Sequence, residues 1–159
     1  MRHVVVLLAS LVVLSGAVRA QQGAASEPPA KLETAHLTMT TSVKPASGTR
    51  ATLVLDVVPK PKMHVYAPGQ KDYIPISVTL TPASAFTSRA PVFPKGETFV
   101  FPATKETQLV YSKPFQITQD VTLTRAAGPM TIKGTVRYQA CDDQVCYIPK
   151  TVPVSRTVR

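Results

Sequence analysis

Hydrophobic and polar residues alternate along most of the chain, and a period of two is the pattern of β-strands with one buried face. The alternating segments are 37–43, 53–57, 74–80, 99–101, 109–111, 115–117 with 121–123, 130–141 and 150–158. Turn-forming residues separate them, as at 46–48 and 127–129. No stretch of ten or more residues keeps a helical period without a proline or glycine. The pattern therefore predicts an all-β protein.

Seven to nine short strands joined by turns are typical of an immunoglobulin-like β-sandwich, with a β-barrel as the alternative. Pro75, Pro114 and Pro153 fall within or beside these segments and cannot donate a ladder hydrogen bond, so we expect them at sheet edges or strand ends. The chain has no tryptophan, whereas an antibody domain packs one on its inter-sheet disulfide. We expect one sandwich domain over 35–159 that is not an antibody domain.

The first twenty residues have the composition of a secretory signal peptide. A short basic start precedes an apolar run over 4–14, and small residues before Gln21 offer a cleavage site. The run is too short for a transmembrane helix, which needs about 20 apolar residues. The alternative is an uncleaved anchor, and either reading places the domain outside the cytoplasm. Residues 21–34 are small, polar and proline-bearing, which predicts a flexible linker.

The chain is basic, with 18 Lys and Arg against 9 Asp and Glu. These charges are scattered rather than gathered in a stripe with stacking aromatics, so we expect no nucleic-acid partner. The sequence also lacks a Gly-x-Ser-x-Gly elbow and a glycine-rich phosphate loop, which argues against hydrolase and nucleotide sites. The composition therefore suggests solubility and a mild attraction to acidic partners.

The mature chain has two histidines, His36 and His64. No second ligand stands at a fixed offset from either, so both are expected to be strand residues and no cofactor is expected. Met63 and His64, together with Met39, Met130 and the two thiols, could however hold Cu(I), which prefers soft ligands. A periplasmic copper-binding protein thus remains an alternative.

The only cysteines are Cys141 and Cys146, and an exported chain with two cysteines normally joins them. A disulfide that closes a loop of about six residues contributes only about 2 kcal/mol to stability, so this bond would stabilise the fold only weakly. The cysteines flank the loop of a predicted hairpin and lie close enough to be bridged. If the preceding strand continues to residue 141, Cys141 lies on the polar, accessible face. Both a redox-active and a structural disulfide remain open.

Asp142 and Asp143 lie between the two sulfurs, where negative charge disfavours a thiolate. We therefore expect the reduced pair to be mostly protonated at neutral pH and to depend on a partner for fast exchange. A plain solvated turn is the alternative interpretation of the two aspartates.

The segment YQACDDQVCYIPKTVPV, residues 138–154, resembles the cysteine hairpin of the N-terminal domain of the thiol:disulfide interchange protein DsbD. Residues 63–66 and 72–76 resemble the family's early strand and the extended segment after it, and 99–102 falls at its aromatic cap loop. The resemblance implies an immunoglobulin-like domain outside the inner membrane. Such a domain takes electrons from a membrane thiol transporter and passes them to thioredoxin-fold periplasmic proteins, a route that includes cytochrome c biogenesis.

The resemblance also implies roles for individual residues. Cys141 and Cys146 would be the redox pair of a protein-disulfide reductase or interchange component, with Cys146 forming the mixed disulfide. The residues implied to cap or line the pair are Tyr66, Phe99, Phe101, Tyr138, Asp142, Asp143 and Tyr147. Tyr66 and Tyr73, taken without the resemblance, are equally explained as packing residues.

Two departures from the family qualify these roles. Four residues separate the cysteines here, whereas some members have five. The chain also lacks the transmembrane segments and the thioredoxin-like domain of full-length DsbD, so we expect a free-standing module with a separate electron donor. The remaining alternative is an exported binding or scaffold module with a structural disulfide.

Overall fold

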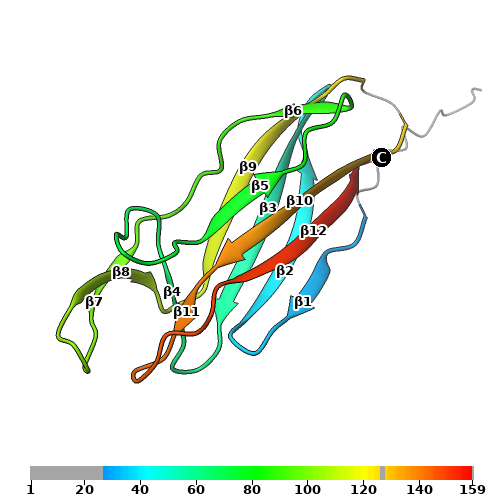
Figure 1. The fold of residues 1–159 in the computed structure, drawn as a ribbon. Helices are drawn as coiled ribbons and strands as arrows, with labels where there is room; N and C mark the ends of the chain where they lie inside the picture. Colours follow the sequence, from blue (N-terminus) through cyan, green and yellow to red (C-terminus); the bar gives the residue numbers. More distant parts are fainter. Residues whose placement is uncertain (1–26, 126–127, 159) are drawn as a thin grey trace, which may run out of the picture.

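Two antiparallel sheets lie face to face along the length of the molecule (Figure 1). The computed structural model describes residues 27–125 and 128–158. The first sheet has the order β1-β2-β3-β9-β6, with strands Ala30–Glu33, Leu37–Pro45, Arg50–Pro59, Phe115–Leu123 and Phe86–Ser88. The second has the order β12-β10-β5, with strands Lys150–Val158, Met130–Tyr138 and Ser77–Leu80.

A third, smaller sheet extends one end of this sandwich (Figure 1). Its order is β11-β4-β8-β7, with strands Ala140–Cys141, His64–Tyr66, Thr107–Tyr111 and Glu97–Val100. Because it contains Cys141, we call it the cysteine sheet. Within the described residues no helix is long and apolar enough to cross a membrane.

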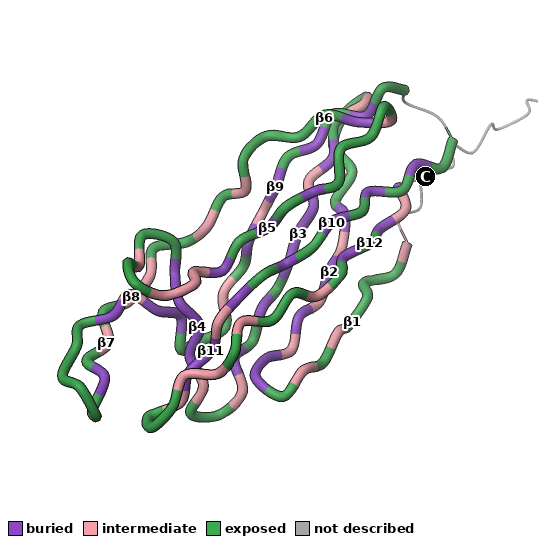
Figure 2. The backbone as a smooth tube through the Cα atoms, viewed as in Figure 1, coloured by how far each residue is buried: buried purple, intermediate pink, exposed green. Residues whose placement is uncertain are grey.

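The main core lies between the two large sheets (Figure 2). In β10 buried and exposed residues alternate without interruption from Met130 to Tyr138, so one face of the strand enters the core. The guanidinium of Arg156 on β12 is also buried, and its Nε donates a 2.8 Å hydrogen bond to the carbonyl of Thr41 on β2. This bond joins the two sheets directly.

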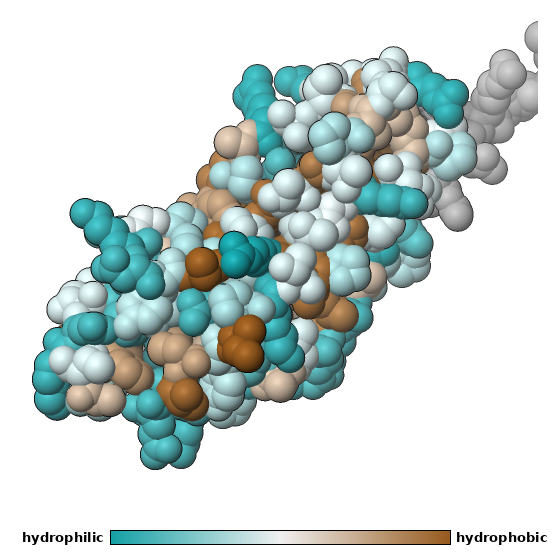
Figure 3. All heavy atoms as spheres, in the orientation of Figure 1, coloured by the Kyte–Doolittle hydropathy of each residue, from teal (hydrophilic) through white to brown (hydrophobic). Residues whose placement is uncertain are grey.

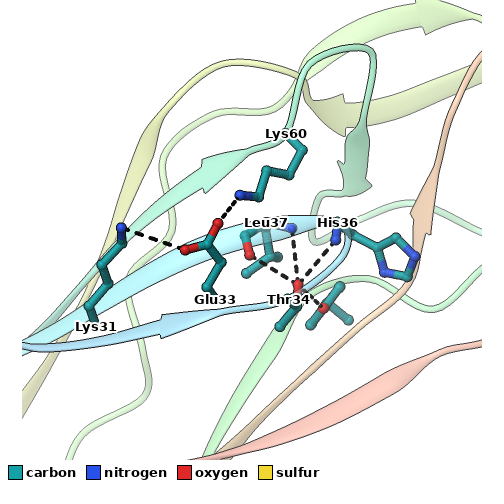
Figure 4. A network of polar contacts seen from close by, with 7 residues as sticks. Lys31, Glu33, Thr34, His36, Leu37 and Lys60 are labelled. Atoms are coloured by element: carbon teal, nitrogen blue, oxygen red, sulfur yellow. Dashed lines mark hydrogen bonds and ion pairs between the residues drawn. The ribbon is translucent and has the colours of Figure 1, made fainter.

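The predicted flexible linker over 21–34 is wrong at its C-terminal end, because Ala30–Glu33 pair with β2. Figure 4 shows the contacts that hold this region: Glu33 pairs with Lys60, and the Thr34 hydroxyl accepts from the amides of His36 and Leu37. These bonds tighten the turn into β2, which places His36 in the turn and not in a strand. The predicted signal peptide over 1–20 lies outside the described residues.

The prolines occupy the positions that their chemistry requires. Pro153 lies in β12, an edge strand of its sheet, and Pro114 immediately precedes β9. Pro75 lies in the extended segment before β5, so the segment predicted over 74–80 is a strand only from Ser77. The predicted strand over 130–141 is likewise interrupted, because β10 ends at Tyr138.

Candidate redox site

Cys141 and Cys146 form a disulfide, with their Cα atoms 4.0 Å apart. Cys141 ends β11, and the chain turns back so that Cys146 pairs with it as an isolated bridge. Two backbone hydrogen bonds close the turn: the Asp142 amide donates to the Val145 carbonyl at 3.0 Å, and the Tyr147 amide donates to Ala140 at 2.9 Å. The bond therefore lies at the tip of a hairpin, as predicted.

The cysteine sheet has two faces with different surroundings. One face presents Val65, Leu109, Tyr111 and Ala140 to the main core. The register of the strands places the opposite set on the other face: Cys141, His64, Tyr66, Gln108, Val110 and Phe99. The disulfide thus lies on the outer face of a sheet whose inner face is part of the sandwich core.

The two sulfur-bearing residues differ in accessibility. Cys141 is 0% exposed, whereas Cys146 is only partly buried. The prediction that Cys141 lies on an accessible face is wrong, because the β10 ladder ends before it and β11 pairs with β4 in another sheet. Gln139 occupies the break, where its side chain accepts from the Ile74 amide and donates to the Tyr147 carbonyl, both at 3.1 Å.

Tyr66 touches both sulfurs. Its hydroxyl lies 3.0 Å from Sγ of Cys141 and 3.1 Å from Sγ of Cys146, and because disulfide sulfurs carry no proton, the hydroxyl is the donor. The ring stacks on Tyr73 with centroids 4.4 Å apart, and the Tyr73 hydroxyl donates to Glu106 at 2.8 Å. Burial raises the pKa of Tyr66, so this hydroxyl stays protonated.

His64 and Phe99 lie beside this tyrosine pair. Their ring centroids are 4.5 Å apart, and His64 meets Tyr66 edge-on at 6.2 Å. His64 is 2% exposed, and burial lowers the pKa of its imidazole, against the opposing effects of the Gln108 side chain and of the nearby carboxylates of Asp143 and Asp142. Burial therefore favours the neutral ring.

Asp142 organises the turn between the cysteines. One carboxylate oxygen accepts from the amides of Gln144 and Val145, both at 2.8 Å, and the other accepts from the Tyr147 hydroxyl. These donors, the Gln144 amide foremost, lower the pKa of Asp142. Asp143 is exposed on the same turn. The first aspartate is thus a structural acceptor in the loop rather than a free charge.

The structure separates the residues implied to line the cysteines. Tyr66, Phe99, Asp142 and Tyr147 lie at the disulfide or on its loop. Tyr138 packs in the main core instead, where its hydroxyl donates to Thr34 at 3.0 Å. Phe101 is buried at the β7–β8 turn, where its amide donates to the Glu106 carbonyl at 2.9 Å.

Sequence reasoning missed four residues of this site: Tyr73, His64, Gln108 and Gln139. Tyr73 and His64 lie in segments that carried the family resemblance, but they were interpreted as packing or strand residues. Gln139 lies in the segment that resembles the family's cysteine hairpin, but it was assigned no role. Gln108 gave no signal, because a glutamine in a strand pattern is usually exposed.

The copper alternative loses two of its ligands. Met39 and Met130 are buried in the main core, on strands of the two large sheets. In the part of the chain that the structure describes, no cluster of three His, Cys, Asp or Glu side chains could hold a metal ion.

Comparison with known proteins identifies the family. Residues 32–157 match the family described as thiol:disulfide interchange protein DsbD, N-terminal. The chain belongs to this family. The predicted all-β, immunoglobulin-like sandwich of the DsbD N-terminal family is therefore confirmed. A search of curated proteins found no significant match to the sequence.

Solved structures match this DsbD N-terminal family member at low sequence identity. The N-terminal periplasmic domain of ScsB from Proteus mirabilis superimposes with a TM-score of 0.58 at 13% identity, covering 84% of this chain and 51% of that one. This chain thus corresponds to about half of the ScsB domain. The reduced DsbD N-terminal domain of Neisseria meningitidis gives a TM-score of 0.47 at 19% identity, with coverages of 75% and 89%. The GAE domain of GGA2p from Saccharomyces cerevisiae gives 0.49 at 7%, with coverages of 80% and 96%.

Proposed function

We propose that this chain is an extracytoplasmic thiol:disulfide exchange module that carries two electrons on Cys141 and Cys146. The observation that carries the proposal is the asymmetry of the bond: Cys146 is accessible, Cys141 is fully buried, and the Tyr66 hydroxyl donates to both sulfurs. A disulfide placed only for stability has no need of a buried hydrogen-bond donor. Membership of the DsbD N-terminal family supports the same chemistry.

The proposed exchange begins at the accessible sulfur. A partner thiolate attacks Sγ of Cys146, a new disulfide forms between them, and the Cys141–Cys146 bond breaks with its electron pair on Cys141. The Tyr66 hydroxyl lies 3.0 Å from this leaving sulfur, where it stabilises the negative charge. The partner's second thiol then attacks the partner sulfur that is bonded to Cys146, and the bond to Cys146 breaks. This leaves the partner oxidised and Cys141 and Cys146 reduced. The reverse sequence reduces an acceptor.

The proposed partners are thioredoxin-fold periplasmic proteins and a membrane thiol-electron transporter. Three large hydrophobic side chains near the site are exposed. Val145 and Ile148 are close to Cys146 in the sequence and are 49% and 86% exposed, and Val100 follows Phe99 on β7 and is 54% exposed. Exposed apolar residues around a reactive group suit a transient protein contact. Figure 3 shows the hydrophobic residues of one face as separate spots rather than one continuous patch, which also favours brief encounters.

The proposal includes export and a cap. Residues 1–20 direct the chain out of the cytoplasm, and the ScsB structure comes from a periplasmic domain, which supports a periplasmic location. Phe99 covers the outer face of the cysteine sheet and shields the disulfide from unspecific thiols, since its ring packs against His64 within the cluster that holds both cysteines.

Trapping of mixed disulfides tests the proposal. Cys141→Ser keeps the accessible Cys146 and should capture thioredoxin-fold proteins from a periplasmic extract, as shown by mass spectrometry. Cys146→Ser, the matched control, keeps only the buried thiol and should capture at least about tenfold less. Equal capture by both variants, or unspecific adducts alone, would reject the module.

A redox titration separates the proposal from a structural bond. We expect the disulfide to equilibrate with glutathione or dithiothreitol buffers at a potential well above about −300 mV, the range below which structural bonds resist reduction. Alkylation of freed thiols, read by mass spectrometry, gives the oxidised fraction at each potential. A bond that stays closed through that range would favour the scaffold alternative.

A further inference from the structure

His64 stands directly opposite Cys141 in the cysteine sheet. The two residues are paired across β4 and β11, so their side chains leave the same face. The Cβ atoms of directly opposed residues in antiparallel strands lie about 4.5 to 5.5 Å apart. His64 is therefore the residue of β4 directly opposite Cys141, beside Tyr66, whose hydroxyl contacts the Cys141 sulfur.

The polar atoms around His64 are unsatisfied while the disulfide is closed. Among the described residues, Nε2 of His64 and both amide atoms of Gln108 are buried without a hydrogen-bond partner. Gln108 lies on the same face and is paired with Phe99, whose ring covers His64. Buried polar groups normally have partners, so the unpaired Nε2 of His64 is a nitrogen on which a proton can be placed in another state of the site.

Cys141 needs a base when it closes the disulfide. As a buried thiol it must lose its proton before it can attack, and the thiolate is the reactive form. Tyr66 cannot take that proton, because its own hydroxyl stays protonated. Asp142 is already occupied by two backbone amides and the Tyr147 hydroxyl. Glu97 lies on the same face, but its carboxylate accepts from the Ser112 amide and pairs with Lys113, and Glu106 accepts from the Tyr73 hydroxyl. His64 is the titratable side chain directly opposite Cys141.

We propose that Nε2 of His64 is the base that takes the proton of Cys141 when Cys141 resolves a mixed disulfide on Cys146, and that it returns this proton when the bond is reopened. The inference rests on the exchange proposed above and assigns one of its proton steps. The Cys141 thiol gives its proton to Nε2, and the thiolate attacks Sγ of Cys146. The bond from Cys146 to the partner sulfur then breaks, the partner leaves as a thiolate with the electron pair, and the imidazolium returns its proton to the partner or to solvent.

The surroundings of His64 suit a neutral base. Tyr66 lies on the same strand, Gln108 and Phe99 come from β8 and β7, and β11 with its loop contributes Cys141 and the carboxylates of Asp142 and Asp143. Burial lowers the pKa of His64 and outweighs the opposing effects of the Gln108 side chain and the two carboxylates, so the ring is neutral at pH 7 and able to accept a proton. Below that pKa the ring is already protonated, and the resolving step should slow.

The resolving step can be timed without any protein partner. Reduced protein reacts with 5,5′-dithiobis(2-nitrobenzoate) in two phases, each releasing one coloured thiolate: attack by Cys146, then resolution by Cys141. General-base catalysis contributes about 10² to 10⁴-fold, so His64→Phe should slow the second phase at pH 7 at least about tenfold and leave the first within about twofold. His36→Phe, a second buried histidine that stacks on Tyr147, should change neither phase.

The pH profile separates a base from a packing residue. In the unaltered protein the rate of the second phase should rise with pH and become constant above the pH at which ring-proton NMR shows that His64 titrates. In His64→Phe it should instead rise about tenfold per pH unit, because only hydroxide then removes the proton. His64→Gln replaces the phenylalanine variant if that one does not fold. An unaltered protein whose second phase rises without a bend at the His64 titration overturns the inference. Because the reagent is a small disulfide, that result leaves the proposed partner exchange untouched.

Discussion

The Tyr147 hydroxyl donates a 2.7 Å hydrogen bond to Oδ2 of Asp142, across the turn that separates the two cysteines. The other oxygen of the same carboxylate accepts the amides of Gln144 and Val145. One side chain therefore holds three donors of the turn between the sulfurs, so we expect the order of this loop to depend on its protonation state.

Acidification should loosen the turn. The pKa of Asp142 is lowered in the folded protein, chiefly by the Gln144 amide, so its contribution is complete above the usual aspartate pKa and is lost as pH falls through the lowered value. The amide-proton shifts of Gln144 and Val145 should titrate together with a midpoint below about 3.9. Asp142→Ala should abolish that titration, whereas Asp143→Ala should preserve it. Titration at or above the usual value would contradict the loop assignment.

Tyr66→Phe should slow opening of the disulfide. The variant keeps the ring stacked on Tyr73 but removes the donor to both sulfurs. A hydrogen bond to a charged group contributes about 1.5 to 3 kcal/mol, so we expect reduction by dithiothreitol at pH 7 to slow about tenfold or more. Tyr73→Phe, which removes only the hydroxyl bonded to Glu106, should stay within about twofold. Timed alkylation of the freed thiols, read by mass spectrometry, gives both rates, and equal slowing would attribute the effect to packing.

Phe99→Ala should expose the site to unspecific thiols. The ring packs on His64 and belongs to the cluster around both cysteines, so its removal opens the outer face of the cysteine sheet. Reduction by glutathione should accelerate several-fold, while Val100→Ala, an exposed neighbour on the same strand, should leave the rate unchanged. An unchanged rate in Phe99→Ala would show that the loop does not act as a cap.

Arg156→Met should weaken the contact between the two large sheets and destabilise the domain. The buried guanidinium donates to the Thr41 carbonyl and pairs with Glu27, and the variant removes both contacts. A hydrogen bond that involves a charged group contributes about 1.5 to 3 kcal/mol, so the free energy of unfolding in urea should fall by about 2 kcal/mol. Arg137→Met, at an exposed position of β10, should change it by less than about 0.5 kcal/mol. Comparable losses in both variants would argue against the sheet-joining role.

The long strands could be predicted because only one of their faces is buried. In β10 buried and exposed residues alternate in perfect order, and the periodicity of the sequence records this directly. β4 was not visible as an alternating pattern, because all three of its residues are buried, with the main core on one face and the disulfide on the other. β1 was missed for the opposite reason, since it is a mostly exposed edge strand of four residues, too short to show a period.

The site was predictable as a hairpin disulfide but not in its accessibility. The spacing of the cysteines placed them opposite one another, and the structure confirms this. Extending the β10 alternation to Cys141 gave the wrong face, because Gln139 ends the ladder and the next two residues join a different sheet. Long-range pairing of this kind leaves no local periodicity, so neither the burial of Cys141 nor its pairing with His64 could be read from the sequence.

The cysteine sheet packs against the main core with one face and carries the disulfide on the other, which restricts how the site can move. Val65, Ala140 and Tyr111 anchor its inner face in the sandwich core, so β4, β8 and β11 cannot swing away without unfolding the domain. Cys146 lies outside these strands at the tip of the hairpin and is only partly buried. The anchored sulfur is thus the one that a second protein cannot reach, and contact with an incoming thiol falls to its neighbour.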